Sequence, residues 1–471
     1  GAFEEIGLVA GLITAQPQNL HSHVNLRLRE KKLPNARVSD IYENQAVQLL
    51  DGKLAHLVVT ANEARLEGAK VEDAEAHWAT RRPLVRPLTA DLAEVRIRAF
   101  ADLTAKDAPA YGAKAANLGE LHQLLPAPHR VPGFGVPFSA YRNFAQAAVI
   151  DVAVAAFLAD PRAAGDARFR RTTLRALRDQ LEAAPLTSAM HDRLREAALT
   201  AFGPGFATLP IRFRSSSNAE DGETLTGAGL YDSYRGCFAD DEDSDDIGPS
   251  RCLSESERGH LAAELARREQ EQAAHPDRVW LRDIVDDLRG DLTKERPVAR
   301  ALRKVYASLW NERAFEERAH YGMDHTRAFM GVAVNPSFVR ERVDAVAVTN
   351  VPVMGAAPIT RLISQSNGQP VVRPADPTLV PETLTFRRGP EDRAVDVQVV
   401  TRSSQSMAPL WRDEQLTVLS QLLGKVQDHF AARVYPQIPS LSLDLEIKIT
   451  DDDRVVIKQA RPYPAATPSP P

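Results

Sequence analysis

Hydrophobic and polar positions in the first 80 residues predict a small α/β unit. The apolar run IGLVAGLIT, residues 6–14, predicts a buried strand, and residues 22–33 predict a helix with Ser22 as its N-cap. A short strand at PNARV, a helix at SDIYENQAVQLL and a strand after the turn in DGKLAHLVVT follow. Because strands and helices alternate, we expect residues 1–80 to form an α/β domain that can move as one body.

The pattern changes after residue 80. Prolines and alternating charges predict a connecting segment at residues 81–105. Residues 106–465 read as one large unit, with long helices at about 170–202 and 254–320 and with C-terminal strands. The apolar stretch 144–159 contains Gln146 and Asp151 and is too short for a membrane span, so it predicts a core helix. The low-complexity tail, residues 466–471, is expected to be disordered.

Alternation is clearest near the C-terminus, in LSLDLEIKITDDDRVVIKQARPY, residues 441–463. If Asp452 and Asp453 form the turn of a hairpin, Glu446 lies opposite Gln459 on one face. Asp444 then lies opposite Arg461 on the same face. Such oxygen ligands beside a guanidinium suit Mg²⁺ that bridges nucleotide phosphates, and a surface hairpin with cross-strand charge pairs explains the pattern equally well.

Composition narrows the function classes. The chain has 471 residues, of which 58 are basic and 63 acidic, and its net charge is -5. Residues of both charges are mixed along the sequence, which gives no indication of a nucleic-acid surface. Six of the seven residues 240–246 are acidic; they predict a solvated loop, with a calcium loop as the lesser alternative. Cys237 and Cys252 lack zinc-site spacing and read as incidental, although one bridge is possible. Scarce cysteines favour the cytoplasm.

Two further segments carry candidate phosphate chemistry. In AYGAKAANLGEL, residues 110–121, Gly112 permits a tight turn and Lys114 offers a charge to a phosphate, unless it is a solvent-facing lysine. In PIRFRSSSNAEDGETLTGAG, a strand would place Arg212 and Arg214 on one face, followed by a serine- and glycine-rich loop suited to phosphates. An edge strand with a solvated basic face is the alternative.

The stretch NLHSHVNLRLRE, residues 19–30, places two histidines ahead of a predicted helix. His21 and His23 could form part of a metal site, pack in a core, or act in catalysis. A neutral imidazole is a competent nucleophile, and a phosphoryl group on it would lie at a helix N-terminus, where free N–H groups favour negative charge.

Three motifs in order, YGAKAANLGEL…VPGFGVPFSAYRNF, RFRSSSNAEDG…GAGLYDS and DLEIKI…VVIKQARPY, resemble the ATP-binding domain of phosphoenolpyruvate synthase and pyruvate phosphate dikinase, an ATP-grasp fold. The segment HSHVNLRLREKKLPNARV is similar to the phosphohistidine swivelling domain of these dikinases. A histidine domain ahead of the ATP-binding domain is the order of α-glucan water dikinases. The histidine domain looks short at its start, so we expect further sequence upstream.

This resemblance assigns roles residue by residue. It implies that Lys114 and Arg214 bind phosphates and that Arg461 meets the terminal phosphates of ATP. Glu446 and Gln459 would bind ATP and magnesium, with Asp444 as a further metal ligand. His23 occupies the position of the phosphorylated histidine.

The implied function is an ATP- and Mg²⁺-dependent phosphotransferase of the dikinase type. His23 would take a phosphoryl group from ATP and pass it to an unidentified acceptor, a small molecule or a glucan. A second hypothesis is a small-molecule phosphotransferase similar to rifampicin phosphotransferase. A third is an ATP-binding regulatory module without turnover. The fold expected is α/β and α+β, an ATP-grasp unit with a small swivelling domain.

Overall fold

The computed structural model describes residues 9–15, 23–60, 63–80, 85, 87–220, 227, 229–242, 245–338, 341–353, 355–366, 371, 376 and 378–463. Helices and strands are mixed, and the pairing within both large sheets is antiparallel. Ser22, His21 and the tail 466–471 lie outside the described residues, as do the side chain of His23 and the first residues of the strand expected at 6–14.

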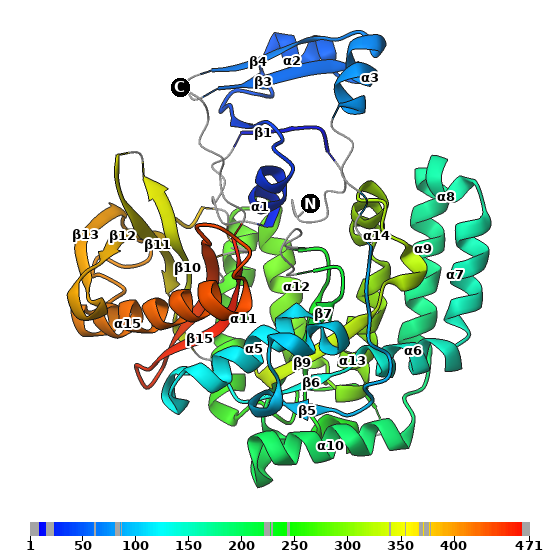
Figure 1. Cartoon of the computed structure of the whole chain (residues 1–471), viewed down its shortest axis with the longest axis vertical. Helices are drawn as coiled ribbons and strands as arrows, with labels where there is room; N and C mark the ends of the chain where they lie inside the picture. The colour runs from blue at the N-terminus through cyan, green and yellow to red at the C-terminus, as the bar shows by residue number, and fades with distance from the viewer. Residues whose placement is uncertain are drawn as a thin grey trace.

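The N-terminal elements lie at the top of Figure 1. They are β1 (Leu12–Thr14), α1 (His23–Glu30), β2 (Asn35–Arg37), α2 (Gln45–Leu50), β3 (Ala55–Val59), β4 (Ala64–Gly68) and α3 (Val71–Ala79). β1 and β2 pair in parallel around α1, which is the predicted strand–helix–strand order, whereas β3 and β4 form a separate antiparallel hairpin. The helix expected from residue 39 begins only at Gln45, because the Asn44 side chain accepts from the first free N–H groups.

A five-stranded sheet forms the first large layer, in the order β5-β6-β9-β7-β8. Its strands are β5 (Arg98–Ala99), β6 (Phe134–Val136), β7 (Ile211–Ser217), β8 (Ser233–Gly236) and β9 (Met330–Pro336). β5 comes from the segment expected to be a connector. β7 pairs with β8 and β9 on its two sides, so the edge-strand alternative for this segment is wrong.

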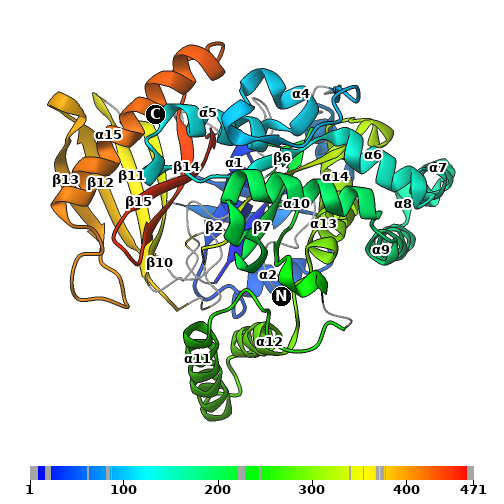
Figure 2. The same ribbon diagram turned by 90° about the horizontal axis from the view of Figure 1, so that it is seen from below.

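Helices separate the strands of this sheet along the chain, and some of them pack against it. They are α4 (Ala108–Tyr111), α5 (Ala113–Leu124), α6 (Phe138–Ala147), α7 (Ile150–Ala159), α8 (Arg162–Gly165), α9 (Ala167–Ala183), α10 (Ser188–Phe202), α11 (Glu255–Ala274), α12 (Trp280–Thr293), α13 (Val298–Ala307) and α14 (Glu312–His320). Ile211 and Phe213 of β7 are fully buried among them. The two long helices expected at 170–202 and 254–320 are divided into shorter ones, and Figure 2 shows α11 and α12 projecting as a pair.

A six-stranded sheet forms the second layer, in the order β13-β12-β11-β10-β14-β15. Its strands are β10 (Glu341–Val353), β11 (Ala356–Ser366), β12 (Glu382–Arg388), β13 (Ala394–Thr401), β14 (Leu443–Thr450) and β15 (Val455–Pro462). Helix α15 (Asp413–His429) and α5 contribute to one apolar core with this sheet. The apolar positions of β14 and β15 face that core, which leaves their polar positions for the opposite face.

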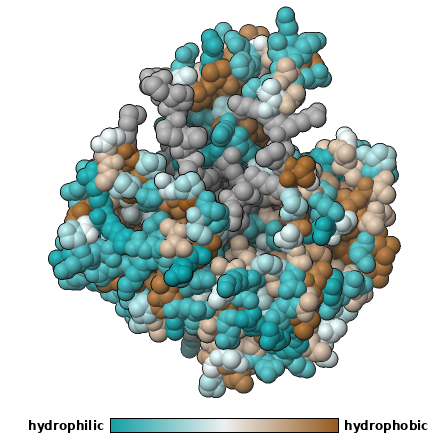
Figure 3. All heavy atoms as spheres, viewed as in Figure 1, coloured by the Kyte–Doolittle hydropathy of each residue, from teal (hydrophilic) through white to brown (hydrophobic). Residues whose placement is uncertain are grey.

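The apolar segment 144–159 does not form one core helix. Val149 has a φ of 58°, and this left-handed residue separates α6 from α7. Among the described residues, no single helix is long and apolar enough to span a membrane; α6 and α7 meet that length and composition only as a pair, which is bent by 84°. Figure 3 shows apolar patches on the N-terminal elements within a largely hydrophilic surface.

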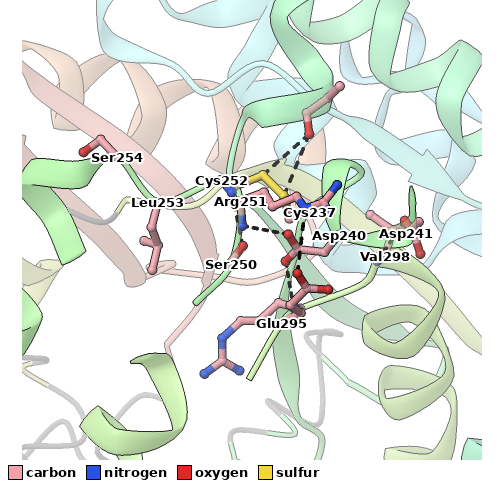
Figure 4. Close-up of a disulfide and its surroundings, with 12 residues drawn as sticks. Cys237, Asp240, Asp241, Ser250, Arg251, Cys252, Leu253, Ser254, Glu295 and Val298 are labelled. Carbon is pink, nitrogen blue, oxygen red and sulfur yellow. Dashed lines mark hydrogen bonds and ion pairs between the residues drawn. A yellow bond between two sulfur atoms is a disulfide. The ribbon is translucent and has the colours of Figure 1, made fainter. Parts of the chain in front are cut away.

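The two cysteines are not incidental. Cys237 and Cys252 form a disulfide that closes the acidic segment into a loop (Figure 4). Asp240 is almost fully buried and accepts backbone hydrogen bonds from Arg251 at 2.7 Å and Arg296 at 2.8 Å. Asp240 therefore organises the loop, and the prediction of a wholly solvated acidic segment is wrong for this residue.

Candidate functional site

The hairpin of β14 and β15 places the predicted polar residues opposite one another. Glu446 pairs with Gln459, and Asp444 pairs with Arg461, as the sequence predicted. The turn itself differs: the Thr450 N–H donates to the Arg454 carbonyl at 3.0 Å, which leaves a three-residue loop instead of two.

A β-bulge restores the predicted register. Ile447 pairs with Ile457 but the next residue, Glu446, pairs with Gln459, so Lys458 is the extra residue on β15. Ile457 is buried in the apolar core, whereas the Lys458 ammonium lies 3.4 Å from Glu446 Oε2 on the opposite face. The bulge therefore adds a cation to the polar face that a regular strand would not supply.

Arg214 connects this hairpin to the other sheet. Its Nη2 donates to Glu446 Oε2 at 2.8 Å and also to Gln459 Oε1, and its Nη1 donates to the carbonyl of Lys458 at 3.3 Å. Arg214 lies on β7, more than 230 residues before both side-chain partners. The structure thus brings together three of the residues that the sequence singled out, and it adds Lys458 to them.

Asp444 and Arg461 form a second, neighbouring pair. Arg461 Nε and Nη2 both donate to Asp444 Oδ2, at 3.0 Å and 2.9 Å, and both side chains are buried. This carboxylate therefore neutralises a guanidinium within the hairpin. The alternative of a solvent-exposed hairpin with surface charge pairs is wrong, because these charges lie inside the molecule.

Lys114 is buried as well, which excludes a solvent-facing lysine. Its Nζ donates to the carbonyl of Ser215 at 2.8 Å and to Glu220 Oε2 at 3.2 Å. The turn ahead of it requires glycine, because Gly112 has a φ of 82° and a Cβ there would overlap the backbone of Ser216. Glu220 was present in the quoted motif SSSNAEDG but was not identified as a partner from sequence.

Positive charges dominate the electrostatics of the cluster. Burial alone would raise the pKa of Glu446, but the nearby cations hold it well below the ordinary value of 4.5; they are Arg214, Lys458, Arg461 and Lys114. Burial lowers the pKa of Lys458 to about 7, against the attraction of Glu446. Glu446 is thus a carboxylate held ionised by its surroundings.

Helix α1 begins at His23 and contacts the larger part of the molecule through its C-terminal end. Arg29 Nη1 donates to the Tyr463 hydroxyl at 2.7 Å, and Lys31 forms a buried ion pair with Glu317. Tyr463 follows Arg461 by two residues, so α1 docks beside the strand that carries the cluster. The side chain of His23 lies outside the described residues, so its role in the site stays a prediction.

A family model for the AMP/ATP-binding domain of pyruvate phosphate dikinase matches residues 108–468. The chain belongs to this family. The match covers Lys114, Arg214 and the whole β14–β15 hairpin, and leaves the N-terminal elements outside it.

A curated relative agrees with this membership. A protein named probable phosphoenolpyruvate synthase, from Pyrococcus horikoshii, is 21% identical over 423 aligned residues, which cover 78% of this chain. The alignment covers 43% of that protein, so the chain spans less than half the length of this relative.

The oxygen ligands expected for magnesium are only partly brought together in this member of the dikinase family. Glu446 and Gln459 face one another and share Arg214, whereas Asp444 is paired with Arg461. No group of three or more His, Cys, Asp or Glu side chains that could hold a metal occurs within the described ranges. A metal here would therefore need oxygen ligands from the nucleotide itself.

Proposed function

We propose that the chain is an ATP- and Mg²⁺-dependent phosphotransferase of the dikinase type, with residues 106–465 as an ATP-grasp unit and residues 1–80 as a swivelling histidine domain. The observation that carries the proposal is the contact of Arg214 with both Glu446 and Gln459, which gathers the family's motifs at one place. Buried cations suit a polyphosphate, because phosphate oxygens accept charge-assisted hydrogen bonds from arginine and lysine.

A small apolar cluster lies beside the charged residues on the same sheet. Val346 on β10 lies next to Glu446, and Ile363 on β11 lies next to Val346. The side chains of Val346 and Ile363 form a buried cluster with Val371. Apolar and charged positions thus lie side by side on this sheet, in the order that a base and its phosphates require.

Glu446 and Gln459 are the residues that would hold magnesium, together with phosphate oxygens. Bound there, the metal would neutralise charge on the phosphates and orient them. Arg214 and Lys114 would bind phosphate oxygens from β7 and α5. The side chains of the site thus contribute positioning and charge neutralisation, which is most of what phosphoryl transfer requires.

His23 is the proposed phosphoryl acceptor within the chain. A ring nitrogen would form a bond to phosphorus while the bond from phosphorus to the bridging oxygen of the nucleotide breaks, and the electron pair leaves on that oxygen. The docking of α1 through Arg29 and Tyr463 supports a place for this helix close to the nucleotide. The onward acceptor would be a small molecule or a glucan.

Incubation with ATP labelled separately at the β- and γ-phosphates tests the proposal. The wild-type chain should gain acid-labile, base-stable label at one of the two positions, and His23→Ala should gain none while binding ATP normally. Equal labelling of His23→Ala would contradict the role of His23. ATP-dependent thermal stabilisation without label or AMP would instead indicate an ATP-binding module without turnover.

A further inference from the structure

Lys458 occupies a distinctive place in the hairpin. As the extra residue of the bulge, it stands with Gln459 opposite Glu446, and both side chains lie on the polar face. The bulge also frees the Lys458 carbonyl from the ladder, and Arg214 Nη1 donates to that oxygen. One extra residue therefore supplies an ammonium group to the cluster and an anchor for its central guanidinium.

The Lys458 ammonium is only partly engaged. Its contact with Glu446 Oε2 is an ion pair at 3.4 Å, and within the part of the chain that the structure describes its Nζ forms no hydrogen bond. Glu446 Oε2 is the same atom that accepts from Arg214 at 2.8 Å. The lysine side chain is 16% exposed and that of Glu446 is 26% exposed, so both can be reached by a ligand.

Lys458 differs from the neighbouring lysines in the carboxylates that pair with it. Lys448, on the same face, lies within 3.1 Å of both Glu341 and Asp344. Lys114 is paired with Glu220 at 3.2 Å. Lys458 instead shares its ion-pair partner Glu446 with Arg214, so two basic side chains contact the same carboxylate.

We infer that Lys458 is a further nucleotide-contacting residue, whose ammonium donates to a phosphate oxygen of bound ATP. The inference rests on the proposed function and adds a phosphate contact that the motifs did not assign. A phosphate oxygen suits this ammonium, because it has three donors and its only described ion-pair partner lies at 3.4 Å. The proposed contact involves the phosphates alone and not the base or the ribose.

Titration calorimetry with ATP and with adenosine tests this contact. Lys458→Met removes the charge and keeps most of the side-chain volume, and its ATP affinity should fall about 10-fold, the effect of one charge-assisted hydrogen bond. Adenosine affinity should stay unchanged, because adenosine has no phosphate. Lys458→Arg should recover most of the ATP affinity. Lys425→Met, an exposed position on α15, is the matched control and should bind ATP as the wild type does.

Several outcomes would overturn the inference. ATP affinity of Lys458→Met within twofold of wild type would show that the ammonium makes no phosphate contact. Equal loss of ATP and adenosine affinity would show that Lys458 supports the hairpin and not the ligand. A wild-type chain that binds no ATP would overturn the proposed function and this inference together, whereas the first two outcomes leave the proposed function intact.

Discussion

Arg214 Nη2 on β7 lies 2.8 Å from Glu446 Oε2 on β14, so this ion pair joins the five-stranded sheet to the six-stranded sheet. The arginine side chain is 8% exposed and therefore largely shielded from solvent. A charged contact in this setting is stronger than one on the surface, where water and salt screen it. The same pair gathers ligand-binding groups from two distant parts of the sequence.

Replacing Arg214 should weaken ATP binding more than it weakens the fold. For Arg214→Met we expect ATP affinity to fall about 10- to 100-fold, because a buried phosphate donor is lost. Calorimetric titration measures the affinity, and Arg175→Met, at an exposed position on α9, controls for the loss of one arginine. Unchanged ATP affinity in Arg214→Met would refute the proposed phosphate contact.

Glu446 and Asp444 should respond differently to the loss of charge. Glu446→Gln is expected to raise the Mg²⁺ concentration needed for half-maximal turnover about 10-fold or more, because a metal-ligand carboxylate is lost. In EDTA the same variant should bind ATP at least as tightly as wild type, since a carboxylate that repels phosphates is gone. Asp444→Asn should change the Mg²⁺ requirement little, because the Asp444 carboxylate already accepts hydrogen bonds from Arg461. An equal rise in the Mg²⁺ requirement of both variants would show that Asp444 is also a direct metal ligand.

The disulfide should contribute measurably to stability. Cys237 and Cys252 are 15 residues apart, and closing a loop of this size stabilises a fold by about 3 kcal/mol. Cys237→Ala/Cys252→Ala should lower the free energy of unfolding by that amount in urea titrations, and dithiothreitol should have the same effect on wild type alone. The cytoplasm keeps thiols reduced, so a chain from that compartment should show two free thiols and the lower stability. A reductant effect on the double variant would point to another cause.

His325 should make the protein sensitive to mild acid. Burial, with the adjacent Arg318 guanidinium, lowers its pKa from the ordinary value of 6.5 to about 3, and its ring stacks on Phe315 at 4.1 Å. Between these two pKa values His325 binds a proton in the unfolded chain but not in the folded one. The stability that the neutral His325 contributes is therefore fully present above pH 6.5 and is lost progressively as the pH falls toward 3.

His325→Asn tests this linkage, because the amide oxygen can still accept from Arg318 Nε. Between pH 6 and pH 5 the wild type should lose about 1 kcal/mol more unfolding free energy than His325→Asn. Parallel pH profiles of the two proteins would contradict a buried neutral histidine.

Much of the charged site could be predicted from the sequence, because side-chain alternation is a local property of strands. The period of two placed Glu446 opposite Gln459 correctly, although the turn was one residue too short. The structure departs from the predicted hairpin in two ways that cancel each other. The three-residue loop shifts the strand register by one residue, and the bulge at Lys458 shifts it back. A bulge leaves no residue-type signal here, so Lys458 could not have been assigned to the polar face.

The remaining misses concern long-range or single-residue effects. The pairing of Lys114 with Glu220 depends on the packing of α5 against β7, which no local pattern encodes. The bridge between Cys237 and Cys252 depends on how the intervening loop folds around buried Asp240. Val149 adopts a left-handed conformation that β-branched residues rarely take, so the break between α6 and α7 was not predictable from its identity.

The bulge on β15 has a consequence for how this hairpin can vary between related genes. Because Ile447 pairs with Ile457 and Glu446 pairs with Gln459, loss of the single codon for Lys458 would leave every other cross-strand partner in place. The ladder would simply become regular, with Ile457 still inward and Gln459 still on the polar face. Gain or loss of one residue can thus alter the charge of the site while the scaffold around it stays fixed.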